Sequence, residues 1–452
     1  MIAMTLPFTL PWLRCAMAGA ALVAATTSSY ALPSFARQTG TECSACHIGG
    51  VGPHLTPHGI RFKLTGYTDG DKAAVPVSAQ LRISHNELEL PTNHKANRLD
   101  ETSVYLAGRL APKLGAYVKV MHSDDPFNSG AQRNTELHNA DVRFADTVRL
   151  LDRDAIWGVS LNNNPGVQDP LDTNQAWGFP ALGTTGSLFN GTTSPTVPRR
   201  VLGLTGYTLW DQHWYAEAGA YRSLSRSLQD RLGQDPQRDP GHFSGLAPYW
   251  RLAYLHDMKT QFFGAGVYGM RAKRQLAVLG PQPLTTERSG PSDTLTDIGV
   301  DAMYEYLGNR EHVVQLRANA VHERRRYGTT PTNPFTGAVA PADATVREFT
   351  FAGTYVFRQH YGITAAVMRS DSKDPVRYFP FGRTDSKVRY TELFWTPFGN
   401  EDSWAAPWAN LRLAAAWTRF DRFNGGTQNV FGPFSPNAAD LDSFQVYAQF
   451  TF

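Results

Sequence analysis

The chain has 452 residues and a formal net charge of +3. This length allows two or three ordinary domains or one large barrel, and so small a net charge gives no indication of nucleic-acid binding. Beyond the N-terminus, no stretch reaches the roughly 18 uninterrupted apolar residues of a membrane-spanning helix. These features exclude a helical membrane protein but leave open a β-barrel, whose signal per segment is weak.

Residues 1–31 have the pattern of a signal peptide. Arg14 provides a positive flank, residues 16–25 form a short apolar run, and Ser-Tyr-Ala at 29–31 is a small-x-small cleavage site. The apolar run is too short to span a bilayer as a helix. We therefore expect the exported chain to begin at Leu32.

The next feature is Cys43-Ser44-Ala45-Cys46-His47, the Cys-x-x-Cys-His signature of c-type haem attachment. The two thiols each form a thioether to one vinyl group, and the adjacent imidazole becomes the proximal iron ligand. A zinc site needs about four ligands, and the one other cysteine, Cys15, falls in the signal peptide. A disulfide is possible in an oxidising compartment but gives no reason for His47. The prediction is one covalent haem c, with Cys43 and Cys46 as anchors and His47 on the iron.

Residues 32–78 form the predicted haem segment. About 45 residues with so few apolar side chains cannot bury a sufficient core alone, so we expect the haem and a larger neighbour to supply it. The second iron ligand stays open. His58, eleven residues past His47, has enough chain to round the porphyrin edge and is the preferred candidate, while His54 is the alternative. Either histidine could instead be a surface or hydrogen-bonding group. Methionines predicted to face a barrel lumen are further candidates: Met121, Met270 and Met303.

From about residue 79 the apolar pattern has a period of two. Ile298 and Val300, for example, alternate with Asp297 and Asp301, which is typical of a strand with one apolar and one wet face. The sixteen segments of this kind are 79–90, 101–111, 113–122, 138–146, 153–162, 199–210, 212–222, 247–257, 259–271, 294–306, 310–324, 346–358, 360–371, 386–397, 406–420 and 441–452. Most have the length of a tilted strand that crosses a bilayer.

The connections between these segments alternate in length. Turns such as Arg358-Gln359 alternate with long polar loops, and the last segment ends on Phe452, as in outer-membrane barrels. Tryptophans and tyrosines near segment ends suit interfacial girdles: Trp210, Trp214, Tyr249, Trp250, Trp395, Trp408 and Trp417. The predicted fold class is all-β, a 16-stranded antiparallel outer-membrane barrel over 79–452, with the haem segment in its mouth or lumen.

Carboxylates in the predicted lumen phase are oxygen donors that suit Fe(II): Asp301, Glu305, Glu348 and Glu392, with Asp124 and Asp125 in a loop. None has a diagnostic ligand spacing, and charged lumen residues are normal in porins. The sequence therefore assigns no metal site apart from the haem iron at His47.

Residues 35–40, 43–47, 55–57, Gly59 and residues 62–67 together resemble the haem segment of monohaem cytochrome–porin fusions of the outer membrane. The resemblance covers about 35 residues closely and the barrel only in architecture. The family members found in iron-oxidising bacteria take electrons from Fe(II) at the cell surface and pass them to periplasmic cytochromes. The resemblance implies the same role here, an Fe(II)-oxidising cytochrome in contact with outer-membrane lipid.

The sequence features can be compared with three functions. The first is this electron conduit, with extracellular Fe(II) as donor and a periplasmic c-type cytochrome as acceptor. The second is a solute porin whose haem segment is a plug or redox gate. The third is a soluble periplasmic enzyme of propeller type, which predicts repeats of about 40–50 residues that the sequence lacks. The sequence leaves open whether the barrel forms a homo-oligomer.

Overall fold

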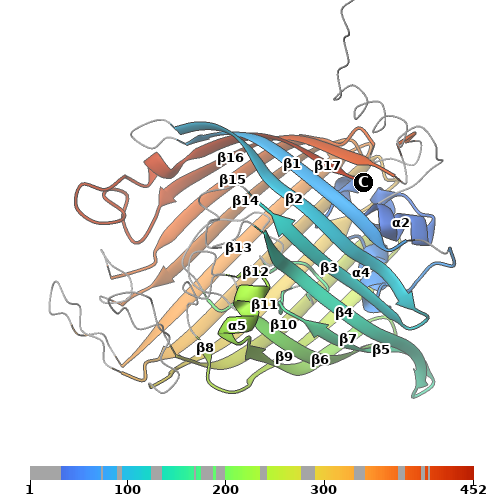
Figure 1. Cartoon of the computed structure of the whole chain (residues 1–452), viewed down its shortest axis with the longest axis horizontal. Helices are drawn as coiled ribbons and strands as arrows, with labels where there is room; N and C mark the ends of the chain where they lie inside the picture. The colour runs from blue at the N-terminus through green and yellow to red at the C-terminus, as the bar shows by residue number, and fades with distance from the viewer. Residues whose placement is uncertain are drawn as a thin grey trace, which may run out of the picture.

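The computed structural model describes most of the chain from Leu32 onward (Figure 1). The described residues are 32–72, 75–88, 94–123, 135–166, 169–174, 187–189, 199–234, 242–275, 291–329, 339, 342–374, 382–398, 403–405 and 408–452. The predicted signal peptide, Cys15, Asp124 and Asp125 lie outside these residues. No helix in the described segments is long and apolar enough to span a membrane.

Strands dominate the structure. They are β1 (Val77–Leu88), β2 (His94–Ala111), β3 (Leu114–His122), β4 (Thr135–Leu150), β5 (Arg153–Asn162), β6 (Val201–Trp210), β7 (Trp214–Ser223), β8 (His242–Phe243), β9 (Ala247–Asp257), β10 (Gln261–Gln275), β11 (Asp293–Tyr306), β12 (His312–Arg326), β13 (Asp343–Phe357), β14 (Tyr361–Ser372), β15 (Ser386–Trp395), β16 (Asn410–Arg422) and β17 (Ser443–Thr451). The helices are α2 (Pro33–Thr39), α3 (Cys43–Cys46), η1 (Ile48–Gly50), α4 (Pro57–Leu64), α5 (Arg226–Arg231) and η4 (Ala439–Leu441).

The sheet closes on itself. Each long strand pairs antiparallel with its neighbour in sequence, and β1 pairs with both β2 and β17. The two-residue β8 pairs only with the end of β10, while β7 pairs directly with β9. The described strands without β8 therefore form a closed barrel of sixteen strands, and the predicted fold class is confirmed. A propeller is excluded.

The side chains that alternate along each strand face the inside and the outside of the barrel in turn. On β11, Val300 is 53% exposed on the outer face, whereas its neighbour Asp301 is 6% exposed and faces inward. Because successive side chains of a strand point to opposite faces, one register gives an apolar exterior and a polar interior. Most of the predicted girdle aromatics lie outside, but Tyr249 does not: it is buried among inward side chains.

One rim carries short turns and both ends of the barrel. Leu151-Asp152 joins β4 to β5, residues 358–360 join β13 to β14, and Gln80 of β1 pairs with Thr451 of β17 close to the same rim. The connection from β15 to β16, residues 396–409, is a longer exception on this rim. The opposite rim carries the long connections, as the sequence predicts for a porin-like barrel.

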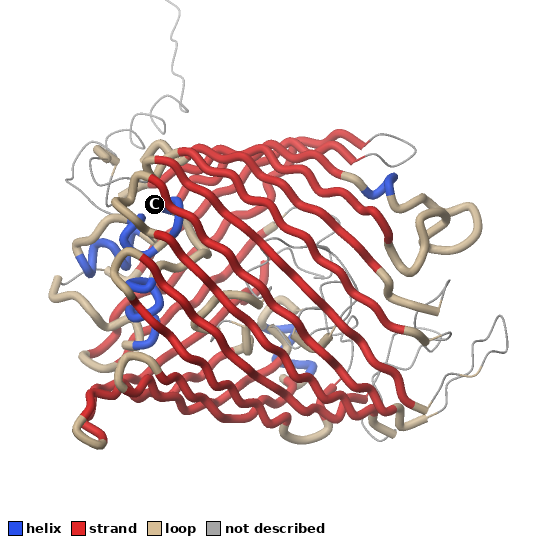
Figure 2. The backbone as a smooth tube through the Cα atoms, turned by 180° about the vertical axis from the view of Figure 1, so that it is seen from behind, coloured by secondary structure: helices blue, strands red, loops and turns tan. Residues whose placement is uncertain are grey.

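Residues 32–72, the N-terminal segment, lie at the short-turn rim beside β1 to β3 and β17 (Figures 1 and 2). Local signals explain their helices. Pro57 opens α4 with its fixed φ, and the Thr56 side chain accepts from the backbone N–H of Gly59 at 3.2 Å. Gly40 ends α2 in the left-handed conformation, at φ 74°. The chain can therefore turn from α2 into the haem motif.

Candidate functional site

The haem motif forms a single helical turn. Cys43 and Cys46 lie at the two ends of α3, and both side chains are buried. The described residues contain no disulfide, so each keeps a thiol. His47 follows in extended conformation, with φ −128° and ψ 137°. The two thiols are therefore one helical turn apart, and the His47 imidazole follows directly, so all three side chains come from one short stretch of backbone.

The chain after His47 folds back against the motif. His47 and Leu55 form an antiparallel bridge, and the N–H of Ile48 donates to the carbonyl oxygen of His54 at 2.9 Å. The N–H of Thr56 donates to the carbonyl of Cys46, also at 2.9 Å. Because facing residues of a ladder share a side and successive residues alternate, His47 and Leu55 share one face and His54 has the other.

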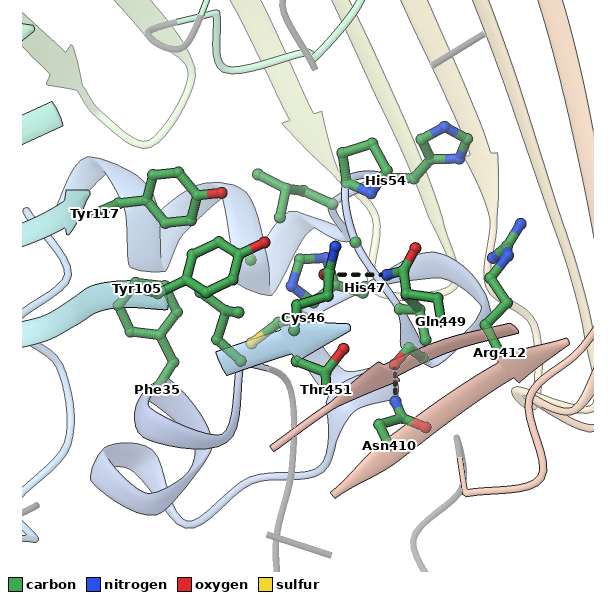
Figure 3. A pocket seen from close by; sticks show the side chains of 18 of the residues that line it. Phe35, Cys46, His47, His54, Tyr105, Tyr117, Asn410, Arg412, Gln449 and Thr451 are labelled. Carbon is green, nitrogen blue, oxygen red and sulfur yellow. Dashed lines mark hydrogen bonds between the residues drawn. The ribbon is translucent and has the colours of Figure 1, made fainter. Parts of the chain in front are cut away.

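A cavity of about 240 Å³ lies between the N-terminal segment and the barrel wall (Figure 3). Cys46 and His47 line it, together with apolar side chains of the segment: Leu32, Phe35, Val51, Leu55 and Phe62. Phe35, Phe62 and Tyr67 form mutual ring contacts, with centroids 5.0 to 6.0 Å apart. The barrel contributes side chains from β1, β2, β3, β16 and β17: Gln80, Arg82, Glu101, Tyr105, Tyr117, Lys119, Asn410, Arg412, Tyr447, Gln449 and Thr451.

These residues fit a covalently attached haem. Burial lowers the pKa of His47 to about 4, so its imidazole is neutral at neutral pH, which is the form that binds iron. Its Nδ1 is buried and has no hydrogen-bond partner among the described atoms. Burial raises the pKa of the Cys46 thiol to about 12, which keeps it protonated and apolar. A neutral imidazole, two thiols and an aromatic cavity match the chemistry of a c-type site.

The structure changes the ranking of the second-ligand candidates. His58 is exposed and does not line the cavity that Cys46 lines; it lines a second pocket, which His47 also borders together with Asp257 and Lys259. His54 is buried and lines the cavity, but its Nε2 accepts from Arg317 of β12 at 2.6 Å. Figure 3 shows the His54 ring apart from Cys46 and His47. The lumen methionines Met121, Met270 and Met303 are buried but do not line the cavity.

Side chains of the barrel hold the segment from several directions. Tyr207 of β6 donates to the Leu64 carbonyl at 2.8 Å, and Asn410 of β16 donates to the Gly50 carbonyl at 2.6 Å. From the segment, the Tyr67 hydroxyl donates to Asp141 of β4 at 2.7 Å. These bonds occupy helix ends and turns that would otherwise leave buried polar groups unpaired.

A loop from the opposite rim also reaches the segment. We call its described residues, 163–166 and 169–174 between β5 and β6, the inner loop. Lys63 donates to the Asp169 carbonyl at 2.8 Å, and Leu171 packs in one apolar cluster with Ile60 and Leu64. The Asp169 carboxylate accepts from the N–H groups of Leu171, Thr173 and Asn174 and pairs with Arg251.

The four lumen carboxylates of the sequence prediction are all buried and all engaged. Asp301 pairs with Arg251, Glu392 with Arg412, Glu305 accepts from Gln315, and Glu348 accepts from Ser187. Sequence reasoning missed Lys63 and the inner loop as parts of the site. The one available signal, a run of Asn and Asp after β5, indicates turns but not their partners.

Comparison with solved structures returns bacterial channels. The chain is similar to DcaP, an outer-membrane channel of Acinetobacter baumannii, at 12% identity and TM-score 0.47, covering 86% of this chain and 99% of that one. It is similar to OmpF of Salmonella typhi in complex with daunomycin (12%, TM-score 0.46, 83% and 97%) and to an anion-selective porin from Comamonas acidovorans (10%, 0.42, 83% and 98%).

Neither a family model nor a curated protein matches the sequence. The closed pairing of β1 with β17 decides the architecture independently. The fold is a porin-like β-barrel.

Proposed function

We propose that this protein is an outer-membrane electron carrier that holds one c-type haem in the mouth of its barrel. The observation that carries the proposal is the joint cavity: the haem motif supplies Cys46 and His47, and five barrel strands complete the walls. The closed sheet with an apolar exterior supports the membrane location, because only such a sheet satisfies every strand hydrogen bond in lipid.

When bound, the haem supplies a one-electron couple whose potential depends on its ligands and surroundings. The residues of the chain determine those surroundings. Neutral His47 would provide the iron ligand, Cys43 and Cys46 would attach the haem covalently, and Phe35 and Phe62 would keep water from the cavity that they line. One-electron transfer requires no general acid or base.

The short-turn rim is the periplasmic rim of an outer-membrane barrel. The N-terminal segment lies at this rim, which favours a periplasmic c-type cytochrome as the electron acceptor. Extracellular Fe(II) is the proposed donor, on the resemblance of residues 35–67 alone. In a complete turnover, Fe(II) loses one electron and the acceptor gains it.

An experiment on the purified protein in detergent tests whether Fe(II) is the electron donor. Fe(II) is added anaerobically to the oxidised protein, and the haem α-band is followed by stopped-flow absorbance. Rapid reduction that is lost in the Cys43→Ser/Cys46→Ser double variant supports the proposal. Reduction by dithionite but not by Fe(II) overturns iron as the donor and keeps the electron carrier. Protein that carries no covalent haem overturns the electron carrier itself.

The second candidate is a solute porin with a haem-bearing plug or redox gate, which the porin-like barrel favours. The inner loop argues against a wide pore, because Leu171 and Asp169 meet the N-terminal segment inside the lumen. Liposome swelling distinguishes the two. Swelling in small sugars that depends on the haem redox state supports the gate, and impermeable liposomes support the carrier.

A further inference from the structure

The cavity beside His47 is positively charged as well as apolar. Among its lining side chains, Lys63, Arg82, Lys119 and Arg412 are cationic, whereas Glu101 is the one carboxylate. Three of the four cations come from the barrel wall: Arg82 from β1, Lys119 from β3 and Arg412 from β16. A cavity with this combination suits a flat apolar ligand that carries more than one negative charge.

Two of the four cations are hydrogen-bonded to acceptors that do not line the cavity. Arg412 donates twice to Glu392, at 2.7 and 3.1 Å, and lies 3.7 Å from the centre of the Phe394 ring. Lys63 donates to the Asp169 carbonyl of the inner loop. Glu392 and Asp169 do not line the cavity. Arg412 and Lys63 are therefore held by groups outside the cavity and are less able to bind a ligand inside it.

Arg82 and Lys119 are different. Arg82 donates from Nη2 to Gln445 at 2.8 Å and pairs with Asp100 at 3.5 Å, and its side chain is 26% exposed, but its buried Nε donates no hydrogen bond to any described atom. Its guanidinium lies 3.8 Å from the centre of the Tyr447 ring, and this contact keeps it against the barrel wall. A buried guanidinium nitrogen without an acceptor is costly, and an anionic ligand would satisfy it.

Lys119 pairs with Glu101 at 2.8 Å. Glu101 also accepts from Gln80 at 2.7 Å and from Ser103 at 2.6 Å, so its carboxylate stays hydrogen-bonded when Lys119 turns toward a ligand. Arg82 faces Glu101 directly across β1 and β2. The two cations therefore flank one carboxylate on a single patch of the wall.

We propose that Arg82 and Lys119 bind the two propionate groups of the haem. This inference rests on the proposed function. A haem attached through its vinyl groups carries its propionates on the opposite edge, and the thiols are on the N-terminal segment while both cations are on the barrel. The haem would then join the two parts, covalently to the segment and by charge to the wall.

The test compares haem-loaded variants in detergent: Arg82→Gln, Lys119→Gln and, as a matched control, Lys113→Gln. Lys113 also forms a lysine–carboxylate pair, with Asp146 at 2.6 Å, but it lies outside the cavity. A nearby cation disfavours ferric haem, so its removal lowers the midpoint potential. We expect lower potentials in both cavity variants, the wild-type value in Lys113→Gln, and recovery in Arg82→Lys.

Two further readouts separate this role from a structural one. Haem staining on denaturing gels should be unchanged in every variant, because the thioethers do not involve the wall. The propionate bending band in the resonance Raman spectrum should shift in Arg82→Gln and Lys119→Gln. Unchanged potentials and Raman bands with haem attached overturn the propionate assignment alone. Wild-type protein without covalent haem overturns the proposed function and, with it, this assignment.

Discussion

His47 and His54 are separated by seven residues, yet they face opposite sides of one short antiparallel bridge. His47 shares its face with Leu55, whereas His54 accepts from Arg317 across the lumen. His58 is the second residue of α4 and is exposed. The distance along the chain allowed both His54 and His58 to reach the iron, but the direction of each side chain favours neither.

This geometry predicts unequal effects of histidine substitutions on the haem spectrum. His47→Ala should change the iron coordination, because the imidazole lines the cavity beside Cys46. His58→Ala should leave the spectrum as in the wild type, because the exposed His58 does not line that cavity and shares only a separate pocket with His47. Absorption and electron paramagnetic resonance spectra of the ferric proteins measure both. A change of spin state in His58→Ala would contradict the prediction and restore His58 as a ligand.

Among the elements, α4 links the segment to the barrel and to the inner loop. Ile60 and Leu64 of α4 pack with Leu171 and Tyr207, and the Tyr207 hydroxyl donates to the Leu64 carbonyl. The last carbonyls of a helix have no partner within it, so this bond from β6 caps the helix as well as holding it. The docking of α4 therefore depends on a side chain more than a hundred residues away.

Tyr207→Phe removes that bond and keeps the ring packing. We expect a loss of about 1 kcal/mol in the docking free energy of α4, which corresponds to about a fivefold loss of amide protection in hydrogen-exchange mass spectrometry. Tyr215→Phe is the matched control, because the Tyr215 hydroxyl donates to Glu217 of the same strand and not to the segment. Equal losses in the two variants would show that the bond to Leu64 has no special role.

Lys63 makes the docking of α4 dependent on pH. Burial, followed by the nearby Arg143, lowers the pKa of Lys63 from 10.5 to about 8. Between these values a released segment binds a proton at Lys63 that the docked segment does not, so docking becomes more stable as the pH rises from about 8 to 10.5. The neutral amine still donates to the Asp169 carbonyl.

The ratio of α4 amide protection between wild type and Lys63→Met measures this effect at each pH, since the intrinsic exchange rates cancel. We expect the ratio to rise across the interval from pH 8 to 10.5. A ratio that stays constant or falls would mean that Lys63 is protonated in the docked segment.

At the scale of the whole molecule, two segments that come from opposite rims of the barrel meet inside the lumen. The N-terminal segment enters from the short-turn rim, and the inner loop comes from the rim of long loops. Asp169 holds the inner loop through three backbone N–H groups and through Arg251. The conductance of the barrel should therefore depend on this carboxylate.

Asp169→Ala should raise the single-channel conductance in planar bilayers, because it removes the acceptor of these groups and leaves Arg251 with one carboxylate fewer. Asp343→Ala is the control, since Asp343 pairs with Arg324 in an exposed position on the long-loop rim. Retained heat-modifiable migration on gels would show that the barrel is folded. An unchanged conductance in folded Asp169→Ala protein would show that the inner loop does not restrict the lumen.

The sequence by itself determined the barrel and the haem motif. Alternation such as Val300 and Asp301 has the same period as a strand, so local order was sufficient to place sixteen strands and their faces. Cys43, Cys46 and His47 lie within five residues, so their spacing carries its own chemistry. Such features can be recognised without knowledge of the tertiary structure.

Only the tertiary structure decided which side chains complete the site. Arg82 and Lys119 reach the cavity because closure of the sheet brings β1 to β3 beside the N-terminal segment. Lys63 meets Asp169 because a loop that starts at the other rim folds inward. These contacts join residues separated by tens to hundreds of positions, and strand periodicity carries no information about which distant side chains meet. The direction of His54 and His58 depends in the same way on a bridge and a helix start that spacing alone does not show.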